Sequence, residues 1–388
     1  MTKKVLLIGI NGVYNYGCEA IVRGTVNILK QYNPALDVYY ASYNYEDDVR
    51  RLSGCEVNIL KRPPRRRWSY QNIKRKFLSY MRIRYEVPYD SDGWTEKFDC
   101  IFSVGGDIYT LNPQKGYNSS LAVFCEKCQQ RGIPYVLWGA SVGPFDANPA
   151  AYSFYKRHLS KASLIVAREK VTVAYLRSME ITENVVLAPD PAFFVAPEKK
   201  REKVIPVTSR VIGINLSPLS GLFRYSCLEE ALKKQAKVVE ALLREGKRIL
   251  FLPHVLSDTY SDNDLWYLTC LYDSIPEEYR PGIEVVNTDP GFVGIKERML
   301  ECDVVIAARM HCAINAVSAG VPVLFLSYSA KAKGMAEYVY GSEKRVIDLE
   351  QFENIPEWIE LLGDLSVRPD LEKLRSYDFS GLFRRLNL

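Results

Sequence analysis

Short apolar runs rich in Val, Ile and Leu alternate with amphipathic stretches along the chain. Continuous apolar runs are typical of parallel strands that crossover helices bury on both faces, and the amphipathic stretches are typical of those helices. In the first half of the chain, this pattern predicts strands near residues 5–10, 38–41, 57–60, 100–104, 135–138, 164–167 and 185–188. The chain therefore reads as an α/β protein with a doubly wound parallel sheet.

A polar stretch with prolines, residues 196–209, interrupts the alternation and predicts an interdomain linker. Beyond it, strands are expected near residues 211–215, 248–252, 284–286, 304–307, 323–326 and 346–347, and helices are expected to begin near Leu228, Asp264, Gly291, His311 and Lys331. A length of 388 residues fits two domains better than one. We expect two Rossmann-like domains facing a cleft, residues 1–196 and 210–388, the second carrying the C-terminal helices.

The composition is that of an ordered globular protein, with 47% hydrophobic and 25% charged residues. The first apolar stretch is expected to be a strand rather than a signal peptide, and no run approaches the roughly 18–20 residues that span a bilayer. Nine cysteines lie singly, mostly in apolar segments, which predicts free thiols in the cytoplasm. Cys125 and Cys128 have metal or redox spacing, but their expected helix has no second pair or nearby histidine, which favours a structural role.

Basic residues are unevenly distributed, although the net charge is only +5. Residues 61–84 contain ten Lys or Arg residues, no Asp or Glu, and several aromatic side chains. One interpretation of this segment is a solvated helix at the rim of a domain. The other is a contact with a phosphate-rich partner or with an anionic membrane, where the protein would lie peripherally at the inner face of the membrane. No nucleic-acid partner is expected, because the rest of the chain has no basic face or recognised binding motif.

Ligands bind doubly wound sheets beyond the carboxyl ends of the strands, so the loops after strands are the candidate site segments. The first of them contains Asn15 and Gly17 and precedes a helix expected to begin near Cys18. Glycine lets backbone N–H groups approach an anion there, although a tight structural turn explains the glycines equally well. The spacing matches neither the dinucleotide fingerprint nor a P-loop.

Later strands in the first half are also followed by candidate side chains. Gly105, Gly106 and Asp107 follow one strand, and the Asp107 carboxylate suits a sugar hydroxyl or a general base. Ser141 follows the next strand, and Arg168 follows a third, where a guanidinium suits a carboxylate or a phosphate. The alternatives are a turn or helix cap for the first four residues and a salt bridge for Arg168.

The sequence surroundings of His158 and His254, two of the three histidines, predict different roles. His158 lies on a basic helix face, which predicts a surface role. His254 follows a strand, and Asp258, Asp262 and Asp264 follow it in a polar loop. A metal site is an alternative that one histidine with loose carboxylates supports only weakly, so we expect none.

The strongest local pattern surrounds Arg309 and His311, which the strand near 304–307 delivers to the start of a helix. If the chain is still extended there, alternation puts both side chains on the same side. A fixed cation beside a proton-transfer group suits an anionic substrate that undergoes acid-base chemistry. A capping histidine with a surface arginine is the alternative.

Several short motifs occur together and in order. They are Asn-Tyr-Gly-Cys-Glu-Ala at 15–20, Gly-Gly-Asp at 105–107, Trp-Gly-Ala-Ser-Val-Gly-Pro at 138–144, Ala-Arg-Glu-Lys at 167–170, Ala-Pro-Asp-Pro-Ala at 188–192, Ala-Arg-Met-His at 308–311 and Gly-Val-Pro-Val at 320–323. With this set, the chain resembles the polysaccharide pyruvyl transferase family. It departs from the family at Ala140, where a polar residue is common, and in residues 61–84.

The resemblance implies a GT-B-like pair of Rossmann-type domains, phosphoenolpyruvate as donor on the C-terminal side, and a sugar acceptor on the N-terminal side that becomes a cyclic pyruvate ketal. It implies that Arg309 and Arg168 hold the donor and that His311 is the acid-base residue. Further substrate contacts are expected from Asn15, Gly17, Gly105, Gly106, Ser141 and His254. We expect no cofactor or metal, Asp107 as a second catalytic residue, and an acceptor that is either part of a polysaccharide or linked to a lipid diphosphate.

Two other function classes fit parts of the pattern. The predicted two-domain architecture and the Gly-Val-Pro-Val motif also suit a nucleotide-sugar glycosyltransferase. However, Arg-Met-His stands where an acidic ribose-binding residue is expected in that class. The basic segment would also suit a non-catalytic protein that binds carbohydrate or lipid head groups.

Overall fold

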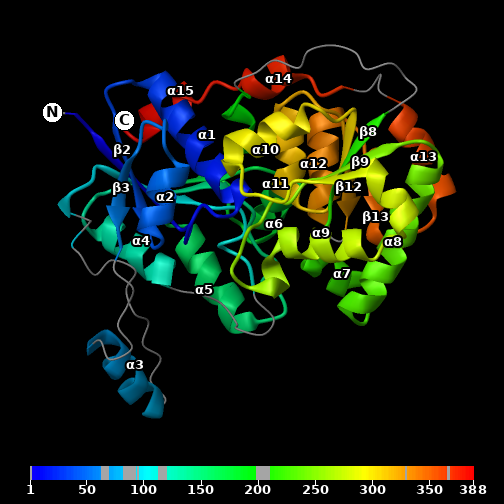
Figure 1. Ribbon diagram of the computed structural model, residues 1–388. Coiled ribbons are helices and arrows are strands. Elements are labelled where there is room, and N and C mark those ends of the chain that lie inside the picture. The colour runs from blue at the N-terminus through cyan, green and yellow to red at the C-terminus, as the bar shows by residue number, and fades with distance from the viewer. Residues whose placement is uncertain are drawn as a thin grey trace. The chain divides into compact units, whose positions relative to one another are not determined.

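The chain forms two compact units. The computed structural model describes residues 2–62, 70–81, 93, 96–111, 120–197, 210–327, 330–364 and 368–388 (Figure 1). Unit 1 comprises Met1–Gly12, Thr25–Asp190 and Asp378–Leu388, and unit 2 comprises Val13–Gly24 and Pro191–Tyr377. Most of the predicted linker, residues 198–209, lies outside the described residues.

Unit 1 is built on a parallel sheet. Its described strands have the order β3-β2-β1-β4-β5-β6-β7. They are β1 (Lys4–Ile8), β2 (Asp37–Ser42), β3 (Asn58–Lys61), β4 (Cys100–Val104), β5 (Tyr135–Ala140), β6 (Leu164–Ala167) and β7 (Val185–Leu187). Every strand predicted for this half is present. The order reverses between β1 and β4, which puts the loops after these strands at a topological switch point.

Helices cover this sheet where the sequence is amphipathic. They are α1 (Tyr16–Tyr32), α2 (Tyr45–Arg51), α4 (Ser120–Gln130), α5 (Pro149–Leu159) and α6 (Lys170–Ser178). A further helix of this half, α3 (Tyr70–Tyr80), is largely exposed, and none of its described residues joins the buried cluster of this sheet. Phe124 of α4 and Tyr155 of α5 share one buried cluster with Leu6, Ile101 and Leu137 of the strands. No helix in the described residues is both long and apolar enough to cross a membrane.

The last helix, α15 (Ser380–Arg385), belongs to unit 1, so the prediction that all C-terminal helices join the second domain is wrong for this helix. Trp138 of β5 is fully buried, and its ring lies 5.3 Å from that of Phe379 and 5.7 Å from that of Phe383, between centroids. The large apolar surface of Trp138 explains this placement, because its burial against two phenyl rings is favourable.

Unit 2 repeats the doubly wound architecture with the order β10-β9-β8-β11-β12-β13 among its described strands. These are β8 (Val211–Asn215), β9 (Arg248–Phe251), β10 (Ile283–Val285), β11 (Val304–Ala307), β12 (Val323–Ser327) and β13 (Val346–Asp348). Its helices are α7 (Pro218–Arg224), α8 (Leu228–Arg244), α9 (Asp264–Asp273), α10 (Gly291–Met299), α11 (Met310–Ser318), α12 (Ala330–Tyr340), α13 (Ile355–Gly363) and α14 (Leu371–Arg375).

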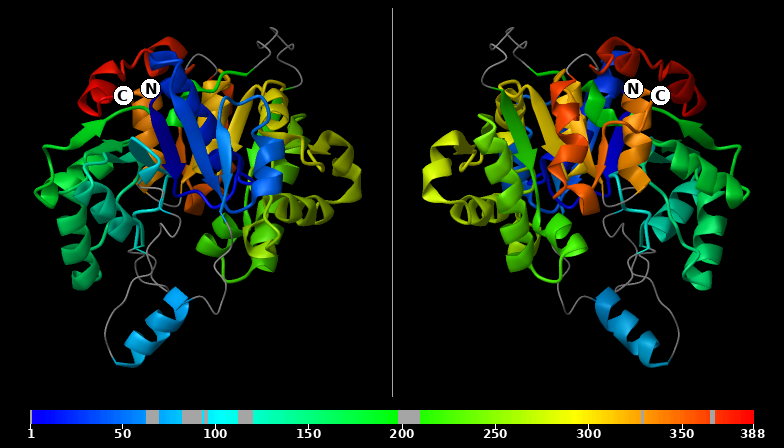
Figure 2. Two further views of the ribbon diagram at one scale, coloured as in Figure 1. Left: turned by 90° about the vertical axis from the view of Figure 1, so that its left-hand side faces the viewer. Right: turned by 90° about the vertical axis from the view of Figure 1, so that its right-hand side faces the viewer.

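Both faces of this second sheet are buried, as the continuous apolar runs predict. Val305 and Ala307 of β11 belong to one core cluster, whereas Val304 and Ile306 belong to another. Figure 2 shows the strands and helices of each unit from two further sides. The order reverses between β8 and β11, so these two strands form the switch point of unit 2.

The start of α1 belongs to unit 2, which the sequence did not indicate. This helix begins at Tyr16, two residues before the predicted start. A Cβ atom at Gly24 would lie 1.8 Å from the Pro191 carbonyl oxygen, so only glycine allows α1 to approach the short 3-10 helix η2 (Pro191–Phe194) this closely. In the middle of the chain the division between the units falls between Asp190 and Pro191, a few residues before the predicted linker.

Candidate active site

Asn215 connects the strand ends at the switch point of unit 2. Its buried side-chain amide donates to the Leu252 carbonyl (2.9 Å) and to Asp264 Oδ2 (3.2 Å), and its Oδ1 accepts from the Arg309 backbone N–H (3.0 Å). One side chain thus fixes the loops after β8, β9 and β11. The sequence analysis missed this residue, although a polar residue at the end of a predicted apolar strand was a usable signal.

Arg309 is held by two carboxylates. Its Nε and Nη2 lie 3.1 and 2.8 Å from Asp264 Oδ1, and Nη2 also donates to Asp262 Oδ1 at 2.7 Å. Asp264 is fully buried, whereas 48% of the Asp262 side chain is exposed. Burial alone would lower the pKa of Arg309, but these two carboxylates outweigh burial and raise it. Arg309 is therefore a fixed cation with one solvent-accessible counter-ion.

Asp264 is the anchor of this network. It also accepts hydrogen bonds from the backbone N–H groups of His254 and Val255, each at 3.1 Å. Burial raises the pKa of Asp264, while Arg309 and the hydrogen-bond donors act in the opposite direction. The metal alternative is not supported, because Asp264 binds these donors and no three metal-ligating side chains converge within the described residues.

His311 lies in the first turn of α11, directly against the start of α1. Arg309 is the N-cap residue and has an extended backbone, and its side chain does not cap the helix. A Cβ atom at Gly17 would lie 2.5 Å from His311 Cβ and 2.9 Å from its Nδ1. Glycine at position 17 therefore leaves the space that the imidazole occupies. Asn15 shapes the same turn, because its Oδ1 accepts from the Gly17 N–H at 2.8 Å.

His254 supports this turn from inside unit 2. Its carbonyl accepts from the Tyr16 N–H (3.1 Å), and its ring meets the Tyr16 ring edge to face with centroids 5.6 Å apart. Its Nε2 lies 3.0 Å from the side-chain amide nitrogen of Asn315. Burial, then the charges of His311 and Arg309, lower the pKa of His254, which keeps it neutral. With 1% exposure, His254 reaches solvent much less than expected for a substrate ligand.

The switch point of unit 1 forms a second cluster. Gly9 and Gly105 both have positive φ angles, and a Cβ atom at Gly9 would lie 2.6 Å from the Val104 carbonyl oxygen. The Ser141 N–H donates to the Gly106 carbonyl at 2.7 Å. The loops that follow β1, β4 and β5 therefore meet at one edge of the sheet, as predicted.

Arg168 lies beneath this glycine loop. Its Nε donates to Ser141 Oγ (3.1 Å), its Nη1 pairs with the buried Asp190 (3.0 Å), and its Nη2 lies 3.7 Å from Asp107 Oδ1. A Cβ atom at Gly106 would lie 2.6 Å from Nη1. Only 2% of Arg168 is exposed, so the structure shows the salt bridge that competes with its predicted donor contact. Asp107, with 61% of its side chain exposed, is the accessible group.

The prediction of a surface role for His158 is wrong. It is 1% exposed and stacks on Tyr109 with ring centroids 5.8 Å apart, near Tyr135 and Tyr155. The basic neighbours in sequence lie on other faces of α5. Burial lowers the pKa of His158 to about 3.

The structural interpretation of the cysteine pair agrees with its burial. Cys125 and Cys128 are both fully buried in α4. Burial raises the pKa of the Cys125 thiol, which disfavours the thiolate needed for metal or redox chemistry.

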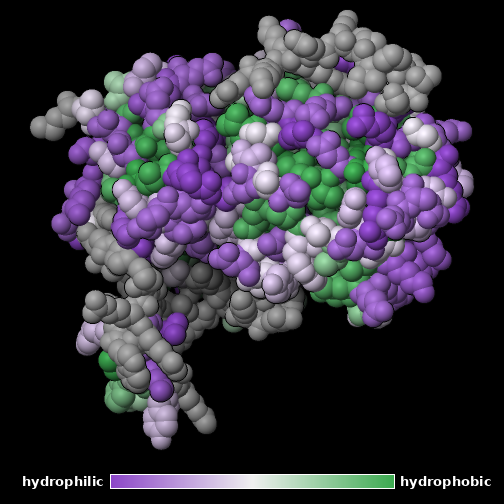
Figure 3. Space-filling view, viewed as in Figure 1, coloured by the Kyte–Doolittle hydropathy of each residue, from purple (hydrophilic) through white to green (hydrophobic). Residues whose placement is uncertain are grey.

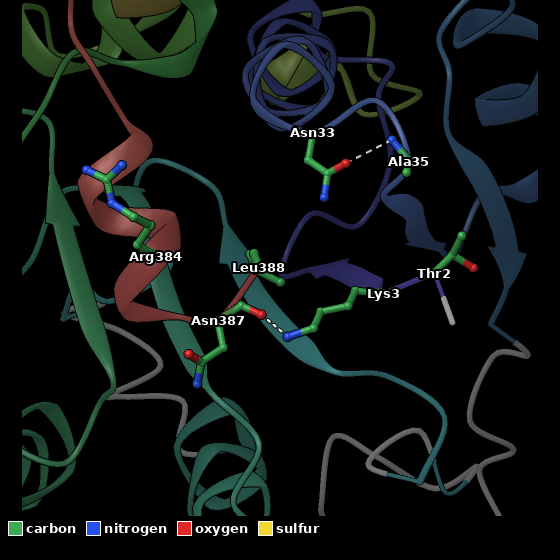
Figure 4. Close-up of a pocket in the computed structure, with 7 residues that line it drawn as sticks. All are labelled: Thr2, Lys3, Asn33, Ala35, Arg384, Asn387 and Leu388. Atoms are coloured by element: carbon green, nitrogen blue, oxygen red, sulfur yellow. Dashed lines mark hydrogen bonds between the residues drawn. The ribbon is translucent and has the colours of Figure 1, made fainter.

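A surface cavity of unit 1 lies elsewhere (Figure 4). It contains no predicted site residue, and Thr2 and Lys3 place it before β1, at the amino end of that strand. The remaining lining residues are Asn33, Ala35, Arg384, Asn387 and Leu388.

Known proteins resemble this chain in sequence and in fold. AmsJ, an amylovoran biosynthesis protein of Erwinia amylovora, is 23% identical over 371 residues, which cover 86% of this chain and 85% of AmsJ. The UDP-GlcNAc 2-epimerase of Methanocaldococcus jannaschii superposes with a TM-score of 0.60 at 12% identity, covering 100% of this chain and 99% of that chain. HepE of Anabaena, solved with UDP-glucose, gives 0.55 at 14% identity, covering 97% and 98%. These likenesses confirm the predicted GT-B-like fold.

The sequence profile of one family covers both clusters. The profile described as polysaccharide pyruvyl transferase matches residues 15–330, which is more than half of the chain. This range contains Asn15, Gly17, Asp107, Arg309 and His311. The chain belongs to the polysaccharide pyruvyl transferase family.

Proposed function

We propose that the protein transfers the pyruvyl group of phosphoenolpyruvate to two hydroxyl groups of one sugar, in a polysaccharide or its lipid-linked precursor, and forms a cyclic ketal. The observation that carries this proposal is the arrangement at the start of α11. The cation Arg309 and the imidazole of His311 lie two residues apart there, and Gly17 leaves room for the imidazole. Membership of the pyruvyl transferase family supports the same reaction class.

The donor is an anion, so the charges around Arg309 decide where it can bind. With both carboxylates ionised, Arg309, Asp262 and Asp264 sum to one negative charge, which repels phosphoenolpyruvate. Asp262 is half-exposed and lies at the end of the short 3-10 turn η3 (Tyr260–Asp262). We infer that the donor displaces Asp262 from Arg309 while buried Asp264 keeps the guanidinium in position. The amino end of α11 adds backbone N–H groups that favour an anion.

His311 supplies the proton that starts the reaction in this proposal. Protonation of the donor methylene gives a methyl group and makes the adjacent carbon electrophilic. One sugar hydroxyl attacks this carbon, the C–O bond to phosphate breaks, and a neighbouring hydroxyl of the same sugar closes the ketal. The two hydroxyl protons end on the methyl group and on the released phosphate, so the reaction balances without a redox partner.

Asp107 is proposed as the base or sugar ligand on the acceptor side. Its carboxylate is largely exposed, and Arg168 lies 3.7 Å away. In this arrangement Arg168 is a positioning residue, because it also holds Ser141 and Asp190 beneath the Gly105–Gly106 loop. Its role as a donor ligand stays a prediction.

The decisive test measures phosphate release from phosphoenolpyruvate with a panel of galactosides, glucosides and mannosaminides. Release is expected only with a suitable acceptor, and His311→Ala should lower its rate about 10²- to 10⁴-fold, as loss of an acid-base residue does. Transfer from a UDP-sugar in place of phosphate release would instead support the nucleotide-sugar glycosyltransferase. Acceptor binding without either reaction would support the non-catalytic alternative.

Donor binding separates an unknown acceptor from a wrong reaction. Arg309→Ala should weaken phosphoenolpyruvate binding about 10- to 100-fold, as loss of a charged hydrogen-bond donor does. Arg309→Lys is measured beside it, because alanine leaves Asp264 buried without its cation. Arg244→Ala, at an exposed arginine of α8, is the matched control. Failure of the parent protein to bind phosphoenolpyruvate would refute the proposed donor.

A further inference from the structure

The helix α3 exposes an unusually apolar surface. Within it and just after it, Tyr70 is 74% exposed, Ile73 51%, Phe77 64%, Tyr80 90% and Met81 54%. Surface hydrophobic residues that occur singly need no explanation, whereas several on one short helix indicate an interaction surface. The space-filling view shows hydrophobic and hydrophilic atoms side by side on this helix (Figure 3).

These apolar residues share one face of α3. At 100° per residue, Tyr70, Ile73 and Phe77 fall within one third of the helix circumference, and Tyr80 and Met81 continue the same stripe. Asn72 and Arg75 occupy the opposite side. The helix is therefore amphipathic, but its apolar face is exposed.

Charge identifies the surface that would cover this face. Lys74 and Lys76 flank the apolar stripe and Arg75 lies on the polar side, while the whole segment 61–84 contains ten basic residues and no acidic one. Lys side chains at the border of an apolar stripe can extend to phosphate groups while their alkyl stems stay in the apolar layer. Tyrosines at both ends of the stripe suit the boundary between acyl chains and head groups.

We propose that α3 lies in the surface of an anionic phospholipid membrane and anchors the protein there, with Ile73 and Phe77 inserted between head groups and Lys74, Arg75 and Lys76 on lipid phosphates. An acidic protein partner would match the charge but not the exposed stripe of aromatic and aliphatic side chains. A second copy of the chain would match the stripe, but it would bring its own positive charge into contact. This inference deepens the proposed function, because it implies an acceptor that is carried on a lipid.

Vesicle co-sedimentation of the full chain tests the proposal without donor or acceptor. The parent should bind vesicles of phosphatidylcholine with phosphatidylglycerol and should not bind vesicles of phosphatidylcholine alone. Substitution of Lys74, Arg75 and Lys76 by Gln should weaken binding about 100-fold, since each basic residue near such a surface contributes about fivefold. The control substitutes Lys233, Lys237 and Arg244 of α8, which removes the same charge elsewhere.

The apolar face needs a separate variant. Ile73→Ser with Phe77→Ser should also reduce vesicle binding at least about tenfold, because two inserted apolar side chains are lost. Tyr80→Trp supplies a local readout, since its fluorescence should shift to shorter wavelength only with anionic vesicles. Sedimentation velocity of the parent and of the Ile73→Ser, Phe77→Ser variant shows whether a second copy of the chain covers the apolar face instead.

The outcomes are distinct. Equal binding by the parent and the α8 control, with loss in both α3 variants, supports the membrane proposal. Absence of vesicle binding by the parent, or a dimer that the Ser variant disrupts, overturns it and leaves the phosphate-release assay unaffected. Conversely, vesicle binding by a parent protein that neither releases phosphate from phosphoenolpyruvate nor binds it would sink the proposed reaction and keep the membrane contact.

Discussion

At the scale of single residues, the candidate site depends on close contacts that leave no space for a larger side chain. Gly17 and His311 are far apart in sequence, yet the absence of one methyl group at position 17 determines whether the imidazole fits. Asp262 and Asp264 both bind Arg309, but only Asp262 is accessible to solvent. These differences lead to two predictions.

Gly17→Ala should reduce phosphate release about 10- to 100-fold without unfolding the protein. The added methyl group would lie 2.5 Å from His311 Cβ and must push the ring away, and a displacement of about 1 Å in a catalytic group is sufficient for such a loss. The rate and the melting temperature are measured beside Gly381→Ala, where an added Cβ meets no atom within 4 Å. An unchanged rate in Gly17→Ala would argue against His311 as the acid.

Asp262→Asn should tighten phosphoenolpyruvate binding about fivefold. The substitution removes the carboxylate that competes with the donor for Arg309, and one charge at about 4 Å in water contributes on the order of 1 kcal/mol. Isothermal titration of the parent and the variant measures the change. Asp258→Asn removes an equal charge from the same loop and separates direct competition from the general field. Weaker binding in Asp262→Asn would mean that Asp262 holds Arg309 in its binding position.

At the scale of elements, α5 shows how packing overrides the apparent character of a sequence. Tyr155, His158 and Leu159 recur at helical spacing and are buried, while Lys156 of the same helix pairs with Glu180 at the surface. The buried imidazole has a lowered pKa, so the folded state resists protonation there.

This burial predicts an acid-sensitive stability. Between the ordinary pKa of histidine, about 6.5, and the folded value of about 3, the unfolded chain binds a proton at residue 158 that the folded chain does not. Stability should therefore fall as pH decreases through this window, by up to about 1.4 kcal/mol per pH unit. Chemical denaturation of the parent and His158→Phe at pH 7 and pH 5 measures the difference. An equal slope in both proteins would contradict it.

At the scale of the whole molecule, segments that are neighbours in sequence do not always belong to the same unit. Near its start the chain passes from unit 1 to unit 2 and back, since Val13–Gly24 counts with unit 2. Near its end it returns from unit 2 to unit 1 at Asp378. The last helix should therefore stabilise the N-terminal sheet.

Phe383→Ala should destabilise unit 1 by about 3–5 kcal/mol, as other buried phenylalanine truncations do, because it leaves a cavity beside Trp138. Hydrogen exchange should accelerate in peptides that contain β5 and stay unchanged in peptides that contain β11. Arg385→Ala, at an exposed position of α15, is the control. Faster exchange confined to unit 2 would refute this assignment.

The strands could be predicted from the sequence alone, because continuous apolar runs have few other stable environments than a doubly buried parallel sheet. The sequence also located the loops that carry Asp107, Arg168, Arg309 and His311, since ligand-binding loops follow strand ends. It did not determine which of these groups stay accessible. Asn215 and Asp264 were missed as organisers of Arg309, and Arg168, His158 and His254 proved to be buried. Burial, salt-bridge partners and the approach of Gly17 to His311 depend on segments distant in sequence, so they are set only when the chain folds and brings these segments together.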